Sequence, residues 1–123
     1  MPRTITLRLP WPPRELSPNS RPNRWKKASA VKAYREQCGW EAKAQSLSWY
    51  FVDPVLATTT FHVKDKIRRD IDNLMASIKP LWDGIVDAGI LQDDSHKHLR
   101  HAEPQLIVGD EKSVEVTLME VEE

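Results

Sequence analysis

The sequence has a single cysteine, Cys38, and therefore no internal disulfide framework. A chain of this kind is typical of a reducing compartment. Long apolar runs are also missing: no stretch approaches the roughly 20 residues that a membrane-spanning helix needs, and the N-terminus lacks the apolar core of a signal peptide. We therefore expect a cytoplasmic protein with no membrane partner.

The chain also lacks a net charge at neutral pH, which by itself argues against a nucleic-acid-binding protein. Its charges are unevenly distributed, however. Residues 1–35 carry nine basic side chains and one acidic side chain, whereas residues 101–123 carry seven acidic side chains and one basic side chain. The charges of the two segments cancel in the net charge of the chain, but the basic segment is still able to present positive charge to a polyanion. The alternative is a solvated surface whose charges are segregated without any binding role.

Alternating apolar residues predict strands at residues 4–9 and 55–63. Two further strands are predicted at 98–108 and 113–119, and we expect the turn GDEK at 109–112 to join them as a hairpin. Val114, Val116 and Leu118 would then point inward.

Two helices are predicted between the strands. The first begins with Ser29 as its N-cap and runs to about Trp49. Its expected buried stripe consists of Val31, Tyr34, Cys38, Ala42 and Trp49. The second helix begins after Asp70 or Asp72 and ends at Gly89, which stands where a left-handed residue is expected. Pro80 lies inside this helix and predicts a kink rather than two separate helices.

The predicted order is therefore β-α-β-α-β-β over 123 residues, of which 40% are apolar and 29% charged. This length and composition are typical of one globular domain. We expect a single α+β domain at residues 1–123, with a largely antiparallel mixed sheet packed against helices.

Two acidic pairs flank the second helix, Asp70 with Asp72 and Asp93 with Asp94. Residues two apart in extended backbone point the same way, so Asp70 and Asp72 are able to share a ligand. Carboxylates that converge repel one another unless a cation lies between them, and Mg²⁺ or Mn²⁺ prefers such oxygen ligands. The competing interpretation is structural: Asp72 as a helix cap and the pair at 93–94 as an exposed turn.

Four motifs occur in a fixed order: LPWPP at 9–13, PNSRPNR at 18–24, RRDIDN at 68–73 and DAGILQDD at 87–94. Together they resemble the RusA family of Holliday-junction resolvases, small endonucleases often carried by phages and prophages. The resemblance implies a homodimer that cuts two strands symmetrically at four-way DNA junctions, in DNA recombination and repair. It also implies Mg²⁺ as cofactor, with Mn²⁺ able to substitute, and the cytoplasm of a bacterial or phage-infected cell as location. The catalytic and metal-binding residues would be Asp70, Asp72 and Asp94.

One position departs from the family pattern. The family usually has a lysine one helical turn after the second aspartate of the DxDN motif, and Ala76 stands there. The nearest substitutes are Lys79, which we take as the catalytic candidate, and Lys66 in the preceding loop. A helical side chain leans toward the N-terminus, so Lys79 is able to point back toward the site. The alternative is a protein of the same fold that binds branched DNA and cleaves it weakly or not at all.

Basic and amide side chains suit contacts with DNA phosphates and base edges. The predicted DNA-binding residues are Asn19, Arg21, Asn23, Arg24, Lys26, Lys27, Arg68 and Arg69. Asn19 and Asn23 are equally suited to forming turns. For Arg68 and Arg69 we favour contact with phosphate, and the alternative is pairing with Asp70 and Asp72.

The aromatic, histidine and cysteine residues outside these motifs have simpler interpretations. Trp25 is expected either to stack on an unpaired base or to cover the core. The four other tryptophans, Trp11, Trp40, Trp49 and Trp82, are predicted to lie in the core. We expect Cys38 in the core too, and the three histidines at 96, 98 and 101 on the surface rather than at a metal.

Overall fold

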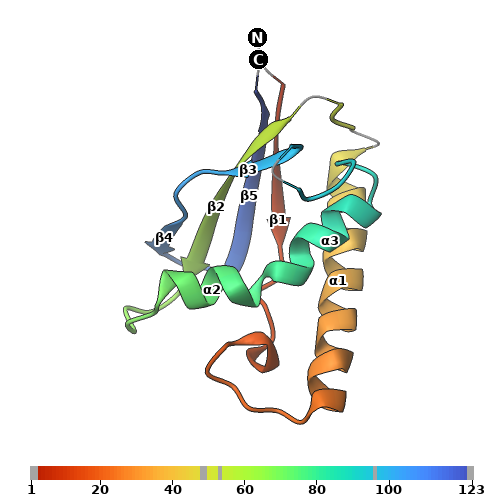
Figure 1. Ribbon diagram of the computed structural model, residues 1–123. Helices are drawn as coiled ribbons and strands as arrows, with labels where there is room; N and C mark the ends of the chain where they lie inside the picture. The colour runs from red at the N-terminus through yellow and green to blue at the C-terminus, as the bar shows by residue number, and fades with distance from the viewer. Residues whose placement is uncertain (1–2, 48–49, 53, 96, 122–123) are drawn as a thin grey trace.

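The computed structural model describes residues 3–47, 50–52, 54–95 and 97–121. Its centre is a five-stranded sheet with the strand order β1-β5-β2-β3, in which β4 also pairs with β2 (Figure 1). The strands are β1 (Thr4–Leu9), β2 (Val55–Val63), β3 (Leu99–His101), β4 (Gln105–Val108) and β5 (Ser113–Glu120). The helices are α1 (Arg24–Ser46), α2 (Ile71–Ser77) and α3 (Lys79–Asp87), with a short 3₁₀ helix, η1, at Arg14–Leu16. The predicted single α+β domain is confirmed.

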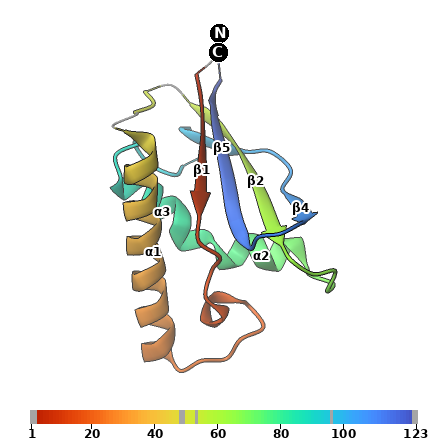
Figure 2. The same ribbon diagram turned by 180° about the vertical axis from the view of Figure 1, so that it is seen from behind.

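The helices cover one face of the sheet. Figure 1 shows α2 and α3 in front of the strands, and the reverse view shows β1, β5 and β2 in front of these helices (Figure 2). Leu7 of β1 is aligned with Val116 of β5, and both side chains are fully buried toward the helices. The intervening residues, such as Thr6 and Arg8, are exposed. The predicted alternation in β1 and β5 is confirmed.

The predicted hairpin is wrong. β5 lies between β1 and β2 and is antiparallel to both, whereas β4 lies on the other side of β2 and is parallel to it. The turn at 109–112 therefore carries the chain across the end of β2, where the Gly109 amide donates to the Val63 carbonyl at 2.8 Å. The strand predicted at 98–108 is also two short strands, interrupted at 102–104, where Pro104 has no N–H to donate.

α1 begins six residues earlier than predicted. Its N-cap is Asn23, whose side chain accepts a 2.8 Å hydrogen bond from the Lys26 amide, so the predicted cap Ser29 lies exposed inside the helix. The helix ends at Ser46, with Leu47 in the left-handed conformation, and the predicted end at Trp49 lies outside the described residues. Asn and Ser are comparable caps, so the preference for one residue type over the other does not distinguish position 23 from position 29.

The buried stripe of α1 follows the prediction. Tyr34, Cys38 and Ala42 are buried and Val31 is partly buried, while Trp49 lies outside the described residues. The Tyr34 hydroxyl donates to the Pro10 carbonyl at 2.8 Å, which ties α1 to the segment after β1. Cys38 is fully buried, so this cysteine is a core residue, and its burial raises the pKa of the thiol to about 12.

The helix predicted with a kink at Pro80 is two helices. α2 ends at Ser77 and α3 begins at Lys79, with Ile78 as the junction. Pro80 lies in the first turn of α3, where its missing N–H would have no partner in the helix anyway. Gly89 has a φ of 83°, the left-handed conformation that its position predicted.

α1 and α3 pack closely through two glycines. A Cβ atom added at Gly84 of α3 would lie 2.7 Å from the Arg35 carbonyl oxygen and 2.9 Å from the Gly39 nitrogen of α1. Backbone therefore meets backbone at this crossing.

The predicted positions of the tryptophans hold in part. Trp82 is buried, and Trp11 packs against the core, where its ring meets Phe61 edge to face. Trp40 is 72% exposed, so its predicted place in the core is wrong, and Trp49 lies outside the described residues. None of the helices in the described part of the chain is long and apolar enough to cross a membrane.

Candidate nucleic-acid interface

Four of the predicted site residues line one cleft. The cleft has a volume of about 520 Å³ and is formed by the loop after η1, the segment before α2 and the first turn of α2. Its lining residues are Ser17, Asn19, Arg68, Arg69, Asp70 and Asn73. Asn19, Arg68, Arg69 and Asp70 were predicted from their motifs. Asn73 belongs to the same DxDN motif, whereas no sequence signal indicated Ser17.

A second depression continues the cleft on the side of α1. It has a volume of about 480 Å³ and shares Ser17 and Asn19 with the cleft. Its other lining residues are Arg14, Glu15, Ser20, Arg21, Pro22 and Lys26. We call the two depressions together the basic groove, because five of their lining residues are Arg or Lys and two are acidic.

Ion pairs elsewhere explain why positive charge concentrates at this groove. Arg3 pairs with Glu120 at 2.9 Å, and Arg35 pairs with Asp87 at 2.6 Å, which lowers the pKa of the Asp87 carboxyl. By contrast, Arg21 makes no ion pair with a described residue. Acidic residues elsewhere in the chain therefore neutralise part of the basic N-terminal segment. Within residues 14–27, Arg14 pairs with Glu15 at 3.8 Å, whereas Arg21 and Lys26 have no ion-pair partner among the described residues.

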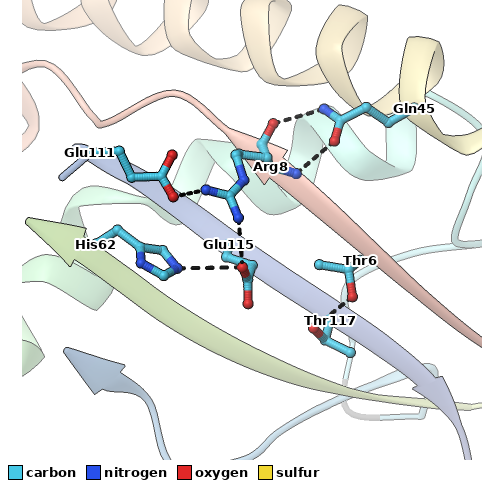
Figure 3. A network of polar contacts seen from close by, with 7 residues as sticks. All are labelled: Thr6, Arg8, Gln45, His62, Glu111, Glu115 and Thr117. Atoms are coloured by element: carbon cyan, nitrogen blue, oxygen red, sulfur yellow. Dashed lines mark hydrogen bonds and ion pairs between the residues drawn. The ribbon is translucent and has the colours of Figure 1, made fainter. Parts of the chain in front are cut away.

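Arg8 shows this neutralisation most fully. Its guanidinium contacts Glu111 and lies 3.0 Å from Glu115, on the sheet face that no described helix covers (Figure 3). Gln45 of α1 bonds both the backbone N–H and the carbonyl of Arg8 at 2.7 Å. His62 contacts the same Glu115 carboxylate at 3.4 Å. Arg8 thus belongs to the sheet rather than to the groove.

Asp70 has a structural role inside the cleft. It is the N-cap of α2, and its Oδ1 accepts hydrogen bonds from the amides of Asp72 at 2.9 Å and Asn73 at 3.3 Å. No hydrogen bond from a described residue reaches its other oxygen. The cap fixes the carboxylate at the cleft wall and leaves one oxygen for a ligand.

Asp72 lies differently from the expectation. The backbone is extended at Asp70, but Asp72 is already in the first turn of α2, so the rule for residues two apart in a strand does not apply. The Asp72 side chain is exposed and makes no ion pair with a described residue.

The other acidic pair lies in the loop before β3. Asp93 accepts a 2.8 Å bond from the Ser95 amide and lies 3.6 Å from His98. The Ser95 side chain and the Ser95 amide lower the pKa of the Asp93 carboxyl, and His98 lowers it further. Asp94 lies near His101, whose ring packs on Trp82 with the centroids 4.7 Å apart. Partial desolvation of the His101 ring lowers its pKa, although the residue is exposed overall, and the Asp94 charge opposes this shift. His96 lies outside the described residues.

The described residues contain no group of three His, Cys, Asp or Glu side chains that is arranged to hold a metal ion. Asp70, Asp72 and Asp94 are all described, so the structure does not assemble the expected three ligands. The topology gives the reason. β3 pairs with residues 55–57 at the start of β2, so the loop carrying Asp94 returns to that end, whereas Asp70 follows the other end of β2.

The two arginines of the cleft differ in their surroundings. Arg69 is 16% exposed, donates to Asp65 at 2.8 Å and lies 6.0 Å from the ring centroid of Trp11. Its hydrogen bond lowers the pKa of the Asp65 carboxyl. Arg68 is exposed and makes no ion pair with a described residue. The alternative interpretation, that these arginines pair with Asp70 and Asp72, does not hold for Arg69, which pairs with Asp65 instead.

The remaining candidates fall into two places. Asn23 is occupied as the cap of α1, and Arg24 lies over the ring of Trp25, with its guanidinium carbon 5.0 Å from the centroid. Lys27 and Lys79 line a separate depression of about 250 Å³, together with Ala76. Lys79 is therefore not among the residues that line the cleft with Asp70.

No family model matches this chain. It is similar to a protein from Xylella fastidiosa (strain Temecula1) that is described only as uncharacterized, with 33% identity over 99 residues. The alignment covers 78% of this chain and 63% of the relative, so the chain spans less than two thirds of that protein's length.

Proposed function

We propose that this protein is a Mg²⁺-dependent endodeoxyribonuclease that resolves four-way DNA junctions, as its resemblance to the RusA family implies. One observation carries the proposal. Asn19 comes from one motif and Arg68, Arg69 and Asp70 from another, nearly 50 residues away, yet all four line one cleft that opens into the basic groove. Motifs that occur far apart in the sequence and meet in one cleft favour a shared ligand.

DNA phosphates suit the charged part of this surface. Arg68, Arg21 and Lys26 have guanidinium or ammonium groups without an ion-pair partner among the described residues, so each is able to neutralise a phosphate. Asn19 and Asn73 add amide groups, which donate to phosphate oxygens or base edges. Arg69 would act differently, because its contact with Asp65 fixes the segment that carries Arg68 and Asp70.

The carboxylates fit a magnesium ion in part. Asp70 and Asp72 offer the hard oxygen ligands that Mg²⁺ or Mn²⁺ prefers, and such ions often bind through one or two carboxylates and the substrate's phosphates. Asp94, the third candidate, is not grouped with them. When bound, the ion would activate water and stabilise the leaving oxygen of a phosphodiester. The chain itself would position the phosphate through Arg68 and hold Asp70 through its cap.

The proposal includes a homodimer that acts in the cytoplasm of a bacterial or phage-infected cell, in DNA recombination and repair. A four-way junction needs two equivalent cuts, and one chain offers a single Asp70 cleft. A two-fold dimer supplies two clefts from identical surfaces.

A second function is favoured by two specific observations. Ala76 replaces the family lysine, and Asp94 is not grouped with the other two carboxylates. Both features suit a protein that binds branched DNA and cleaves it weakly or not at all.

A labelled four-way junction and a linear duplex of equal length test both functions. The proposal predicts tighter binding to the junction and symmetric cleavage with Mg²⁺ but not with a chelator. Binding without cleavage would favour the second function. Equal binding to both substrates, without cleavage, would contradict both.

A further inference from the structure

Trp25 is unusually exposed for its residue type. It is 74% exposed in the first turn of α1 and does not belong to the core cluster or to the residues packed against it. Tryptophan is mostly buried in folded proteins, because its large ring gains free energy when it leaves water. The expectation that Trp25 covers the core is therefore wrong, and its ring is free to contact a ligand.

The surroundings of Trp25 favour a negatively charged ligand. The guanidinium carbon of Arg24 lies 5.0 Å from the ring centroid, and Lys26, the next residue, lines the basic groove. The first turn of α1 contains no acidic residue. Basic residues at this end oppose the helix dipole and cost a little stability, which is a reason to look for a role in binding.

Trp40 on the same helix provides a contrast. It is 72% exposed, but the depression beside it contains both charges, with Glu36 and Asp87 as well as Arg35 and Lys43. Both tryptophans are thus exposed, so exposure alone does not distinguish a binding residue. Of these two tryptophans, Trp25 is the one that combines an exposed ring with a cation over that ring and a place beside the basic groove.

We propose that Trp25 stacks on an unpaired nucleobase of the bound DNA. This inference rests on the proposed function, and it assigns the recognition of unpaired bases at a branch point to one residue. Every base presents a π-face that stacks on an aromatic ring, and an arginine beside the ring adds a cation–π contribution. A continuous duplex offers such a face only at its ends. Trp25 would therefore favour branched DNA with unpaired bases over fully paired duplex.

The test compares three variants on two substrates. Trp25→Ala removes the ring, Trp25→Phe keeps an aromatic ring, and Trp40→Ala is the matched control with similar exposure. The substrates are a four-way junction with two unpaired bases at the crossover and a fully paired duplex of the same length. A 2-aminopurine at one unpaired position reports stacking directly through its fluorescence.

Trp25→Ala should weaken junction binding roughly tenfold, the usual scale for one lost base-stacking contact, and leave duplex binding unchanged. Its complex should also lose the change in 2-aminopurine fluorescence, whereas Trp25→Phe and Trp40→Ala should keep both. Since Trp25 is exposed, circular dichroism and the Tm should not change. An equal loss of binding on junction and duplex, or equal effects of the two alanine variants, would overturn the inference.

The outcome separates this inference from the proposed function. If the wild-type protein binds and cuts junctions and Trp25→Ala does so equally well, the stacking role fails and the proposed function stands. If the wild-type protein does not prefer junctions and does not cut them, both fail.

Discussion

Arg69 donates a hydrogen bond to Asp65 at 2.8 Å, and this contact holds the segment that carries the cleft residues Arg68 and Asp70. The Arg69 side chain is also enclosed by Trp11, whose ring centroid lies 6.0 Å from its guanidinium carbon. Arg68 has neither contact among the described residues. Two adjacent arginines thus have different roles, one in positioning the segment and one in presenting charge.

Replacement of each arginine separates these roles. Arg68→Ala should weaken DNA binding and leave the Tm unchanged, because the side chain contacts no described partner. Arg69→Ala should lower the Tm as well, because it leaves Asp65 unpaired and uncovers Trp11. Thermal unfolding and fluorescence anisotropy with labelled DNA measure the two effects. A larger loss of stability in Arg68→Ala would contradict the assignment.

The basic groove should set the salt dependence of DNA binding. Arg21→Ala, in the groove, and Arg24→Ala, beside the groove in the first turn of α1, should each reduce the slope of log K against log salt by about 0.9, the value for one lost phosphate contact. Lys43→Ala is the control, because Lys43 lies about 29 Å along α1 from Arg24 at the helical rise of 1.5 Å per residue. Identical slopes in all three variants would place the DNA surface elsewhere.

The crossing of α1 and α3 should not tolerate a methyl group. Gly84→Ala places a Cβ atom 2.7 Å from a backbone oxygen of α1, so the helices have to move apart. We expect a loss of about 1–3 kcal/mol in the free energy of unfolding, measured by urea denaturation. Gly109→Ala is the control, because an added Cβ meets no atom within 4 Å there. Equal midpoints for the two variants would show that the crossing is looser than described.

His101 should make the fold less stable in mild acid. Partial desolvation of its ring lowers its pKa below the ordinary value of 6.5, so the unfolded chain binds a proton more readily than the folded one. The contribution of the neutral His101 ring to the stability of the fold is therefore complete above pH 6.5, and it decreases as the pH falls below this value. The carboxyls of Asp65, Asp87 and Asp93 have pKa values below 3.8 and do not titrate in this range.

The Tm measured between pH 7.5 and 5.5 tests this contribution. The decrease should be larger in the wild-type protein than in His101→Gln, which has no titrating group at this position. Asp94→Asn should extend the decrease to lower pH, because the Asp94 charge raises the His101 pKa. An identical decrease in the wild-type protein and His101→Gln would refute the assignment.

The elements of the fold were predictable from local patterns, and their pairing was not. Alternation placed β1, β2 and β5, since burial on one face of a strand leaves a period of two in the sequence. The same pattern does not say which strand lies beside which. A turn motif at 109–112 predicted a hairpin, but β5 forms its ladders with β1 and β2 instead. Pro80 likewise fits a kink and a helix start equally well, and the junction at Ile78 decided between them.

The candidate site was predictable where single motifs form one surface. The segment at 68–73 supplies four lining residues of the cleft, and PNSRPNR supplies Asn19. The grouping of Asp94 with Asp70 depended on the path of the chain after α3, which the spacing of residues does not determine. The role of Arg69 required knowledge of its contact with Asp65, four residues earlier in a loop. Sequence therefore indicated the residue types of the site better than their partners.

Cleavage of a four-way junction by Asp70→Asn tests the central claim most directly. Asn is as good a helix cap as Asp, so this variant should keep the N-cap of α2 and the Tm, while it loses the carboxylate charge that a magnesium ion needs. The account predicts that Asp70→Asn binds the junction at least as tightly as the wild-type protein and does not cut it. Asp93→Asn, the control from the other acidic pair, should retain most of the activity. Full cleavage by Asp70→Asn would contradict the proposal that Asp70 is the catalytic carboxylate of this cleft.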